Sequence, residues 1–149
     1  MELKELYKKL IDSGCNRFYI VGIGGPINDD VECLGLHNGI WEVYYIERGQ
    51  KSKPSFTTTE KDKAIKYYHD YILGQEHWHI IAFTRSLEKF DSYKTELENN
   101  GVKIIQNDIP DFKFTGDRVY RLYVTNMDIF KAKKIFKEIP YFDRELEIN

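Results

Sequence analysis

The sequence lacks the features of a membrane-embedded or disulfide-stabilised protein. No run approaches the roughly 18 apolar residues that a transmembrane helix needs, and residues 1–6 mix charged and apolar side chains without the apolar stretch of a secretion signal. There are only two cysteines, Cys15 and Cys33, too few for a disulfide framework and, without histidine, for a zinc site. We therefore expect a soluble cytoplasmic protein with two reduced thiols and no association with a membrane.

The chain also lacks a dominant charge. It carries 22 Lys and Arg against 24 Asp and Glu, a formal net charge of −2. Residues 1–75 contain 10 basic and 11 acidic side chains, and residues 76–149 contain 12 and 13. Because nucleic-acid-binding proteins usually present a strongly basic face, this balance argues against nucleic acid as the main partner.

Sequence signatures of catalysis are missing as well. Gly22 to Gly25 follow a predicted strand, but Pro-Ile-Asn-Asp-Asp comes next, where a phosphate-binding glycine loop needs the start of a helix. No serine lies in a Gly-x-Ser-x-Gly sequence. Cys15 follows the end of a predicted helix, where the helix dipole disfavours a thiolate. We predict that the protein is not an enzyme and has no catalytic residue, metal or cofactor.

Two short clusters of residues are compatible with a different function. His77 and His79 lie two residues apart at the start of a predicted strand, so both imidazoles face one side and could share a metal ion with a third ligand from elsewhere. This pair is the best basis for a metal-assisted enzyme. Arg118 and Arg121 flank tyrosine in another strand, a pattern also found in RNA-binding sheets. Pairing with charges on a neighbouring strand is the simpler explanation of the arginines.

Apolar periodicity and turn signals predict an α+β fold. Helices are expected at residues 2–13, from 59 to 73, from 86 to 99 and from 127 to 138, and strands at 18–21, 31–36, 40–49, 78–83, 102–105 and 119–124. The element order is αβββα followed by βαββα, with antiparallel sheets backed by helices, and the second half is partly ferredoxin-like. We expect one domain, residues 1–149, with possible sub-halves 1–74 and 75–149. Thr59 and Ser86 are the predicted N-caps of the second and third helices.

The segment from Ile40 to Gly49 is the richest in large side chains, in a chain that is 15% aromatic. It follows Asn38-Gly39, a strong signal for a two-residue hairpin. Alternation along the strand predicts that one face enters the core and the other faces outward. The predicted core residues are Trp41, Val43 and Tyr45. The predicted contact residues of this segment are Tyr44, Glu47 and Arg48.

Val31 to Leu73 contains a recognisable arrangement. Cys33-Leu34-Gly35-Leu36 leads through Asn38-Gly39 into Ile-Trp-Glu-Val-Tyr-Tyr-Ile-Glu-Arg-Gly, and Phe56, Glu60, Ala64 and the pair Tyr67-Tyr68 follow. This arrangement resembles small bacterial immunity proteins of polymorphic and contact-dependent toxin systems. The resemblance implies a non-enzymatic inhibitor that binds one cognate toxin domain, often a nuclease.

A basic toxin would be recognised through complementary acidic groups. Acidic residues gather at Asp29-Asp30 with Glu32, on the loop from Asp108 to Asp117, and in the C-terminal tail. The predicted partner-binding residues are Asp29, Asp30, Glu32, Tyr44, Glu47, Arg48, Asp108 and Asp111. The alternative function is a small-ligand-binding or regulatory α+β module without catalysis, in which the loop from Asp108 to Asp117 and a sheet face line a pocket.

Overall fold

The computed structural model describes residues 1–26, 30–110 and 118–142, and the chain divides into two compact units, Met1–His77 and Trp78–Asn149. Each unit has a helix-backed sheet and a separate hydrophobic core. The α+β fold class predicted from the sequence is confirmed. That the units form a single domain stays a prediction.

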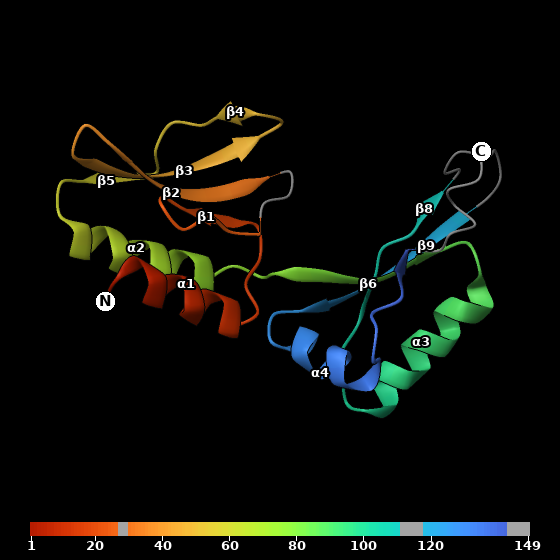
Figure 1. Cartoon of the computed structure of the whole chain (residues 1–149). Coiled ribbons are helices and arrows are strands. Elements are labelled where there is room, and N and C mark those ends of the chain that lie inside the picture. The colour runs from red at the N-terminus through yellow and green to blue at the C-terminus, as the bar shows by residue number, and fades with distance from the viewer. Residues whose placement is uncertain (27–29, 111–117, 143–149) are drawn as a thin grey trace. The chain divides into compact units, whose positions relative to one another are not determined.

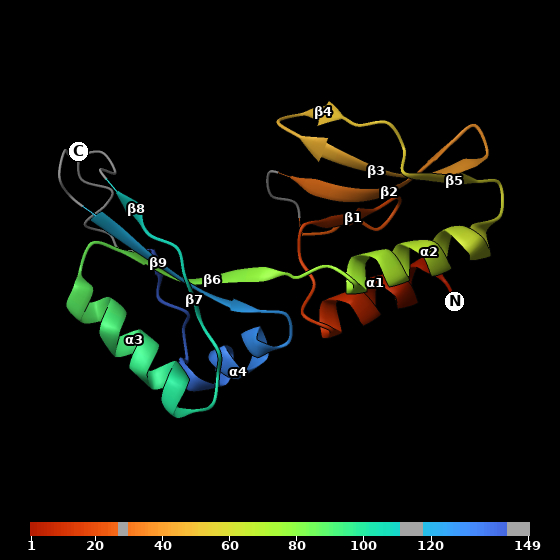
Figure 2. The ribbon, with the colours of Figure 1, turned by 180° about the vertical axis from the view of Figure 1, so that it is seen from behind.

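The first unit contains two helices and a five-stranded sheet (Figure 1). Its elements are α1 (Leu3–Asp12), β1 (Phe18–Ile20), β2 (Val31–His37), β3 (Ile40–Glu47), β4 (Gln50–Lys51), β5 (Phe56–Thr58) and α2 (Lys61–Leu73). The sheet order is β1-β2-β3-β4, and β5 also pairs with β3. All pairs are antiparallel except β1 with β2, which departs from the all-antiparallel sheet expected from the sequence. Figures 1 and 2 show α1 and α2 on the same face of the sheet, so in the described part of this unit the other face carries no helix.

The core of the first unit lies between the sheet and these two helices. Leu6 and Leu10 of α1 meet Ala64, Ile65, Tyr68 and Ile72 of α2 and strand residues that include Phe18, Ile20, Leu34, Trp41 and Val43. Trp41 and Val43 are buried, as their alternation along β3 predicted. Tyr45 is not part of this cluster: it is only partly buried, because its cross-strand neighbour is the acidic residue Glu32 and not an apolar side chain. The predicted core position of Tyr45 is therefore wrong.

The N-termini of the second and third helices show whether Thr59 and Ser86 are the N-caps predicted from the sequence. Ser86 caps α3 (Leu87–Asn99), and its Oγ accepts a hydrogen bond from the Lys89 backbone N–H at 3.1 Å. Thr59 does not cap α2, because Glu60 is the N-cap residue and no side chain caps the helix there. The hydroxyl of Thr58 accepts a hydrogen bond from the Glu60 N–H at 3.0 Å instead, so a threonine one residue earlier shapes the turn into α2.

The described part of the second unit has a strand, a helix, three strands, a second helix and a final short strand. After β6 (Trp78–Thr84) come α3, β7 (Ile105–Gln106), β8 (Ile109–Pro110), β9 (Arg118–Thr125), α4 (Asp128–Ile135) and β10 (Tyr141–Phe142). The strand order β10-β6-β9-β7 matches the split βαβ arrangement expected for this half. The two-residue β10 pairs with β6 in parallel, however, which an all-antiparallel ferredoxin-like sheet would not allow. The core of the unit includes Ile81, Phe90, Leu97, Leu122 and Val124.

Candidate functional site

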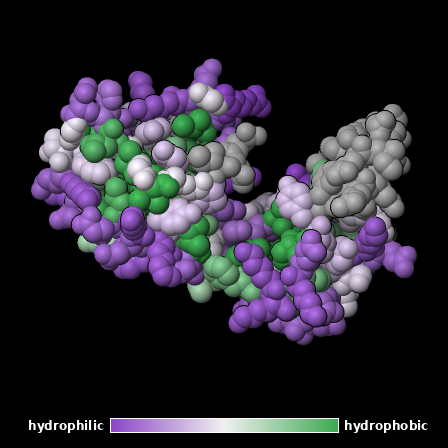
Figure 3. Space-filling view, viewed as in Figure 1, coloured by the Kyte–Doolittle hydropathy of each residue, from purple (hydrophilic) through white to green (hydrophobic). Residues whose placement is uncertain are grey.

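The tip of the β3–β4 hairpin is rich in polar and charged residues. Arg48 and Gly49 form its two-residue turn between the paired residues Glu47 and Gln50, with positive φ angles of 50° at Arg48 and 78° at Gly49. An open hollow of about 530 Å³ lies here, lined by Tyr45, Glu47, Arg48, Gln50, Lys51 and Ser52. In Figure 3 the part of the surface over β4 is coloured mainly hydrophilic. The hairpin therefore presents charged groups of both signs around an open depression.

Three carboxylates converge on the side chain of Tyr45 beside this hollow. Asp30, at the entrance to β2, hydrogen-bonds with the Tyr45 hydroxyl, while Glu32 of β2 and Glu47 at the end of β3 lie close enough to act on it through their charges. Partial burial and these negative charges together raise the pKa of the Tyr45 hydroxyl above its ordinary value of 10. Within the described residues, none of the three carboxylates forms an ion pair. The edge of the sheet thus carries a concentrated negative charge.

Glu32 connects this surface to the scaffold. Its carboxylate hydrogen-bonds with Tyr71 and Gln75 of the α2 region, and burial raises its pKa above the ordinary 4.5 despite those two hydrogen bonds. Its backbone carbonyl accepts a 2.7 Å hydrogen bond from the buried hydroxyl of Tyr68. Glu32 was predicted as a partner contact. The structure places its carboxylate between the sheet and α2, where it also orders the surface beside Tyr45.

A row of aromatic rings leads from β5 to Glu32. Phe56 stacks on Tyr67 with ring centroids 4.1 Å apart and planes 10° from parallel, and Tyr67 stacks on Tyr71 at 5.8 Å and 15°. All three rings are partly exposed. The row ends at Tyr71, whose hydroxyl bonds to the Glu32 carboxylate. Amphipathic rings of this kind supply rigid contact area in protein interfaces.

Tyr44 lies on the opposite face of β3 from Tyr45, as alternation requires. The Lys51 ammonium sits 4.2 Å from the centroid of the Tyr44 ring and 2.9 Å from a carboxylate oxygen of Glu42. The ring packs over Gly35: a Cβ atom there would lie 2.8 Å from Tyr44 Cε1. Gly35 therefore makes room for the ring, and a cation–π contact with Lys51 covers it.

The remaining predicted contact residues are not gathered at this edge. Asp108 belongs to the second unit, where its carboxylate accepts hydrogen bonds from Gln106 at 2.9 and 3.0 Å and from Arg118 at 3.4 Å. Its side chain is 15% exposed, so these neighbours already occupy much of it. Asp29 and Asp111 lie outside the described residues. The structure thus groups Asp30, Glu32, Glu47 and Arg48, and it places Tyr44 on the other face of the same strand.

The histidine pair does not form the shared metal site considered from the sequence. His77 is buried, its Nε2 donates to the Ile72 carbonyl at 2.8 Å, and its Nδ1 accepts from the Asn16 backbone N–H at 3.2 Å. Both ring nitrogens are therefore used to tie the end of α2 to the segment after α1. Among the described residues, no group of three or more His, Cys, Asp or Glu side chains is arranged to hold a metal ion.

The glycine-rich turn and the arginines of β9 have structural roles. Gly22 to Gly25 form a turn in which the Gly24 N–H donates to the Ile20 carbonyl at 2.8 Å, and the next element in the described residues is the strand β2. Arg121 is held by Asn107, with its Nε 2.8 Å from the backbone carbonyl and Nη2 2.9 Å from Oδ1. Arg118 pairs with Asp108. The two arginines therefore fasten the segment after β7, which is a cross-strand role like the one favoured from the sequence.

Sequence reasoning missed Tyr45, Tyr71 and Gln75 as parts of this site. A usable signal existed for Tyr45. Once Asn38-Gly39 is taken as a two-residue turn, counting outward pairs Glu32 with Tyr45, as observed, and an acidic residue across the strand argues against a core tyrosine. No comparable rule linked Tyr71 or Gln75 to Glu32, because that contact depends on how α2 packs against the sheet.

In comparisons with known protein families, curated proteins and solved structures, nothing matched this chain. No helix in the described part of the chain is long and apolar enough to cross a membrane. The site is therefore interpreted from its own chemistry.

Proposed function

We propose that this protein is a cytoplasmic immunity protein that binds and neutralises a cognate secreted toxin domain, such as a nuclease. The observation that carries the proposal is the convergence of Asp30, Glu32 and Glu47 on Tyr45, without an ion pair to any described residue. Glu32, Tyr45 and Glu47 of this surface lie within the segment that resembles immunity proteins, and Asp30 immediately precedes that segment.

The chemistry of the surface suits a basic protein partner. A nuclease must attract phosphate groups, so its active-site surface carries lysine and arginine side chains. Uncompensated carboxylates opposite such a surface accelerate encounter and fix the orientation of the complex. Tyr45 and the stacked rings of Phe56, Tyr67 and Tyr71 would supply the rigid aromatic contacts around which binding energy concentrates.

Arg48 and Lys51 give the surface directionality. Both line the same hollow as Tyr45 and Glu47, and Lys51 is already ion-paired with Glu42 on the Tyr44 side of β3. A partner that fits must therefore present an acidic group next to its basic ones, which is a basis for discriminating one toxin from another. Tyr44, on the other face of β3, extends the contact only if the toxin wraps around the hairpin edge.

The second candidate is a small-ligand-binding or regulatory module, and the hollow at the hairpin favours it by size. Small-molecule sites commonly occupy about 300–1,000 Å³, but they are concave and mostly apolar. The hollow here is lined by five polar or charged residues and one tyrosine and opens widely to solvent. A protein surface inserted against it would bury these groups more completely than a small molecule would.

Co-expression tests the proposal directly. A candidate secreted toxin domain, taken from a gene next to the one that encodes this chain, would be induced in cells with and without the chain, and growth and co-purification would be measured. We expect rescue of growth and a stable complex. Failure of both rescue and co-purification would refute the immunity function.

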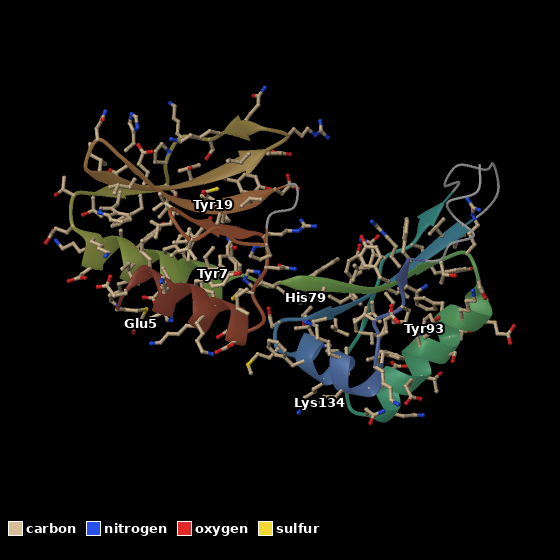
Figure 4. The ribbon with its side chains drawn as sticks, viewed as in Figure 1. Glu5, Tyr7, Tyr19, His79, Tyr93 and Lys134 are labelled. Carbon is tan, nitrogen blue, oxygen red and sulfur yellow. The ribbon has the colours of Figure 1, made fainter. Side chains whose placement is uncertain are left out.

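Charge-neutralising variants locate the surface. Asp30→Asn and Glu47→Gln remove two of the converging carboxylates, and asparagine tolerates the φ of 64° at position 30. We expect slower association with the toxin and a weaker dependence on salt. The matched control is Glu5→Gln, on the exposed side of α1 (Figure 4), which removes the same charge from a different face. Equal effects of the control and the surface variants would show that only net charge matters.

A further inference from the structure

The two Asn-Gly pairs of the chain lie in turns with different hydrogen bonding. Asn38-Gly39 forms the β2–β3 turn and Asn100-Gly101 follows α3, and all four residues are exposed. Both glycines have a φ of 76°. Neither glycine has a side chain to hinder reaction at its backbone nitrogen, so intrinsic reactivity does not favour one pair strongly.

The fold restrains the second pair at both reacting groups. The Gly101 backbone N–H donates to the Glu98 carbonyl at 3.0 Å, and the side-chain amide nitrogen of Asn100 donates to the Glu96 carbonyl at 2.8 Å. These bonds belong to the C-terminal cap of α3. Both must open before the Gly101 nitrogen can turn toward the Asn100 side chain.

The first pair has neither restraint. The Gly39 backbone N–H donates to no group within the described residues, and nothing lies within 4 Å of where a Gly39 Cβ would be. Within the described residues, the one hydrogen-bond partner of the Asn38 amide nitrogen is Nε2 of its neighbour His37, at 3.3 Å, in the same exposed turn. That contact moves with the turn and does not hold the amide to the rest of the fold.

We propose that Asn38-Gly39 is a site of spontaneous deamidation in the folded protein and that the fold protects Asn100-Gly101 from the same reaction. The Gly39 backbone nitrogen forms a bond to the side-chain carbonyl carbon of Asn38, the C–N bond of the amide breaks, and the Gly39 amide proton leaves with the departing group as ammonia. Water then opens the cyclic imide at either carbonyl, giving aspartate or isoaspartate. One water is consumed for each ammonia released.

The product changes the shape of the first sheet as well as its charge. In the unmodified turn, two residues connect the paired positions His37 and Ile40, which suits the twist of the flanking strands. Isoaspartate routes the main chain through one additional carbon, so this two-residue geometry no longer fits. Because this turn joins β2 to β3, a change in its geometry also alters the pairing of the two strands next to it.

Peptide mapping of the full-length protein by mass spectrometry tests the inference. The protein would be incubated at mildly alkaline pH, once folded and once in concentrated urea, and deamidation would be followed at both pairs. Urea gives the intrinsic rates because it removes the hydrogen bonds of the fold.

We compare the ratio of the deamidation rate at position 38 to that at position 100 in folded protein and in urea. We expect this ratio to be about tenfold or more larger in the folded protein, because two hydrogen bonds must open before position 100 can react. The same ratio of rates in both conditions would overturn the inference, as would faster reaction at position 100 in the folded protein.

Discussion

The buried hydroxyl of Tyr68 is the sharpest test of how the first unit is held together. Tyr68 is completely buried in α2, and its hydroxyl donates to the Glu32 carbonyl at 2.7 Å and accepts from the Tyr19 backbone N–H at 3.3 Å. The Tyr19 carbonyl lies 3.1 Å away. One oxygen therefore bridges α2 to β1 and to β2, the parallel pair of the sheet.

Tyr68→Phe removes this bridge and leaves the ring in place. A buried polar group that loses its only strong partner costs about 1–3 kcal/mol, and the ring vacates too little volume for water to enter. We expect the variant to lower the free energy of unfolding of the first unit by about 1–3 kcal/mol. At a urea dependence of about 1–3 kcal/mol per molar, the midpoint moves by roughly 1 M.

The two tryptophans allow the units to be followed separately. Trp41 is buried in the first unit, and Trp78 is 39% exposed at the start of the second. Unfolding would be measured by tryptophan fluorescence in a Trp78→Phe background, where Trp41 is the only tryptophan that remains. This readout does not require both units to unfold together.

Tyr67→Phe is the matched control for Tyr68→Phe. Tyr67 is the preceding residue of the same helix, partly exposed, and its hydroxyl makes no hydrogen bond within the described part of the chain. We expect a change within about 0.5 kcal/mol, as for most surface substitutions. If the two variants have the same stability, the Tyr68 hydroxyl does not brace the sheet and the reasoning is wrong.

Three further predictions concern single groups of the first unit. Burial raises the pKa of both thiols to about 11, so Cys15 and Cys33 should resist alkylation in folded protein and react only in urea; rapid labelling of either folded thiol would contradict this. The raised pKa of Glu32 means that its protonated form favours folding, a contribution present below its ordinary 4.5 and lost as pH rises through the folded value. Glu32→Gln should therefore unfold at higher urea than the parent at neutral pH, with the advantage shrinking in acid, and a pH-independent difference would argue against this. Gly35→Ala should displace the Tyr44 ring from its packed position and alter the near-ultraviolet circular dichroism, and an unchanged spectrum would show that the ring adapts freely.

The helices and the longer strands of the fold follow from local sequence signals, whereas the short strands β4, β5, β8 and β10 were not among those expected and β7 lies at the end of the expected range 102–105. The Asn38-Gly39 turn sets the register of β2 against β3, and apolar spacing locates α1, α2 and α3 to within a few residues. The alternation that buries Trp41 and Val43 fails at Tyr45, because the period-two rule describes a strand whose whole length is covered. Whether a helix covers the end of β3 is decided by packing, which no local signal encodes.

The candidate site also contains features that the sequence predicts and features that depend on tertiary packing. Charge and strand alternation placed Glu47 and Arg48 at the end of β3 and separated Tyr44 from the core. The convergence of Asp30, Glu32 and Glu47 on Tyr45 depends on the pairing of β2 with β3. Of these contacts, the sequence could predict only that of Glu32 with Tyr45, from the register that the Asn38-Gly39 turn sets. The contacts of Glu32 with Tyr71 and Gln75 require the position of α2 and were beyond local reasoning.

Glu32 is where the scaffold and the proposed surface meet. Tyr68 fixes its backbone, and Tyr71 and Gln75 fix its carboxylate. A contact surface whose charged groups are already ordered loses little conformational freedom on binding, so more of its interaction energy appears as affinity. The buried phenol of Tyr68 thus also supports the proposed surface, because it holds in place the strand from which the Glu32 carboxylate projects.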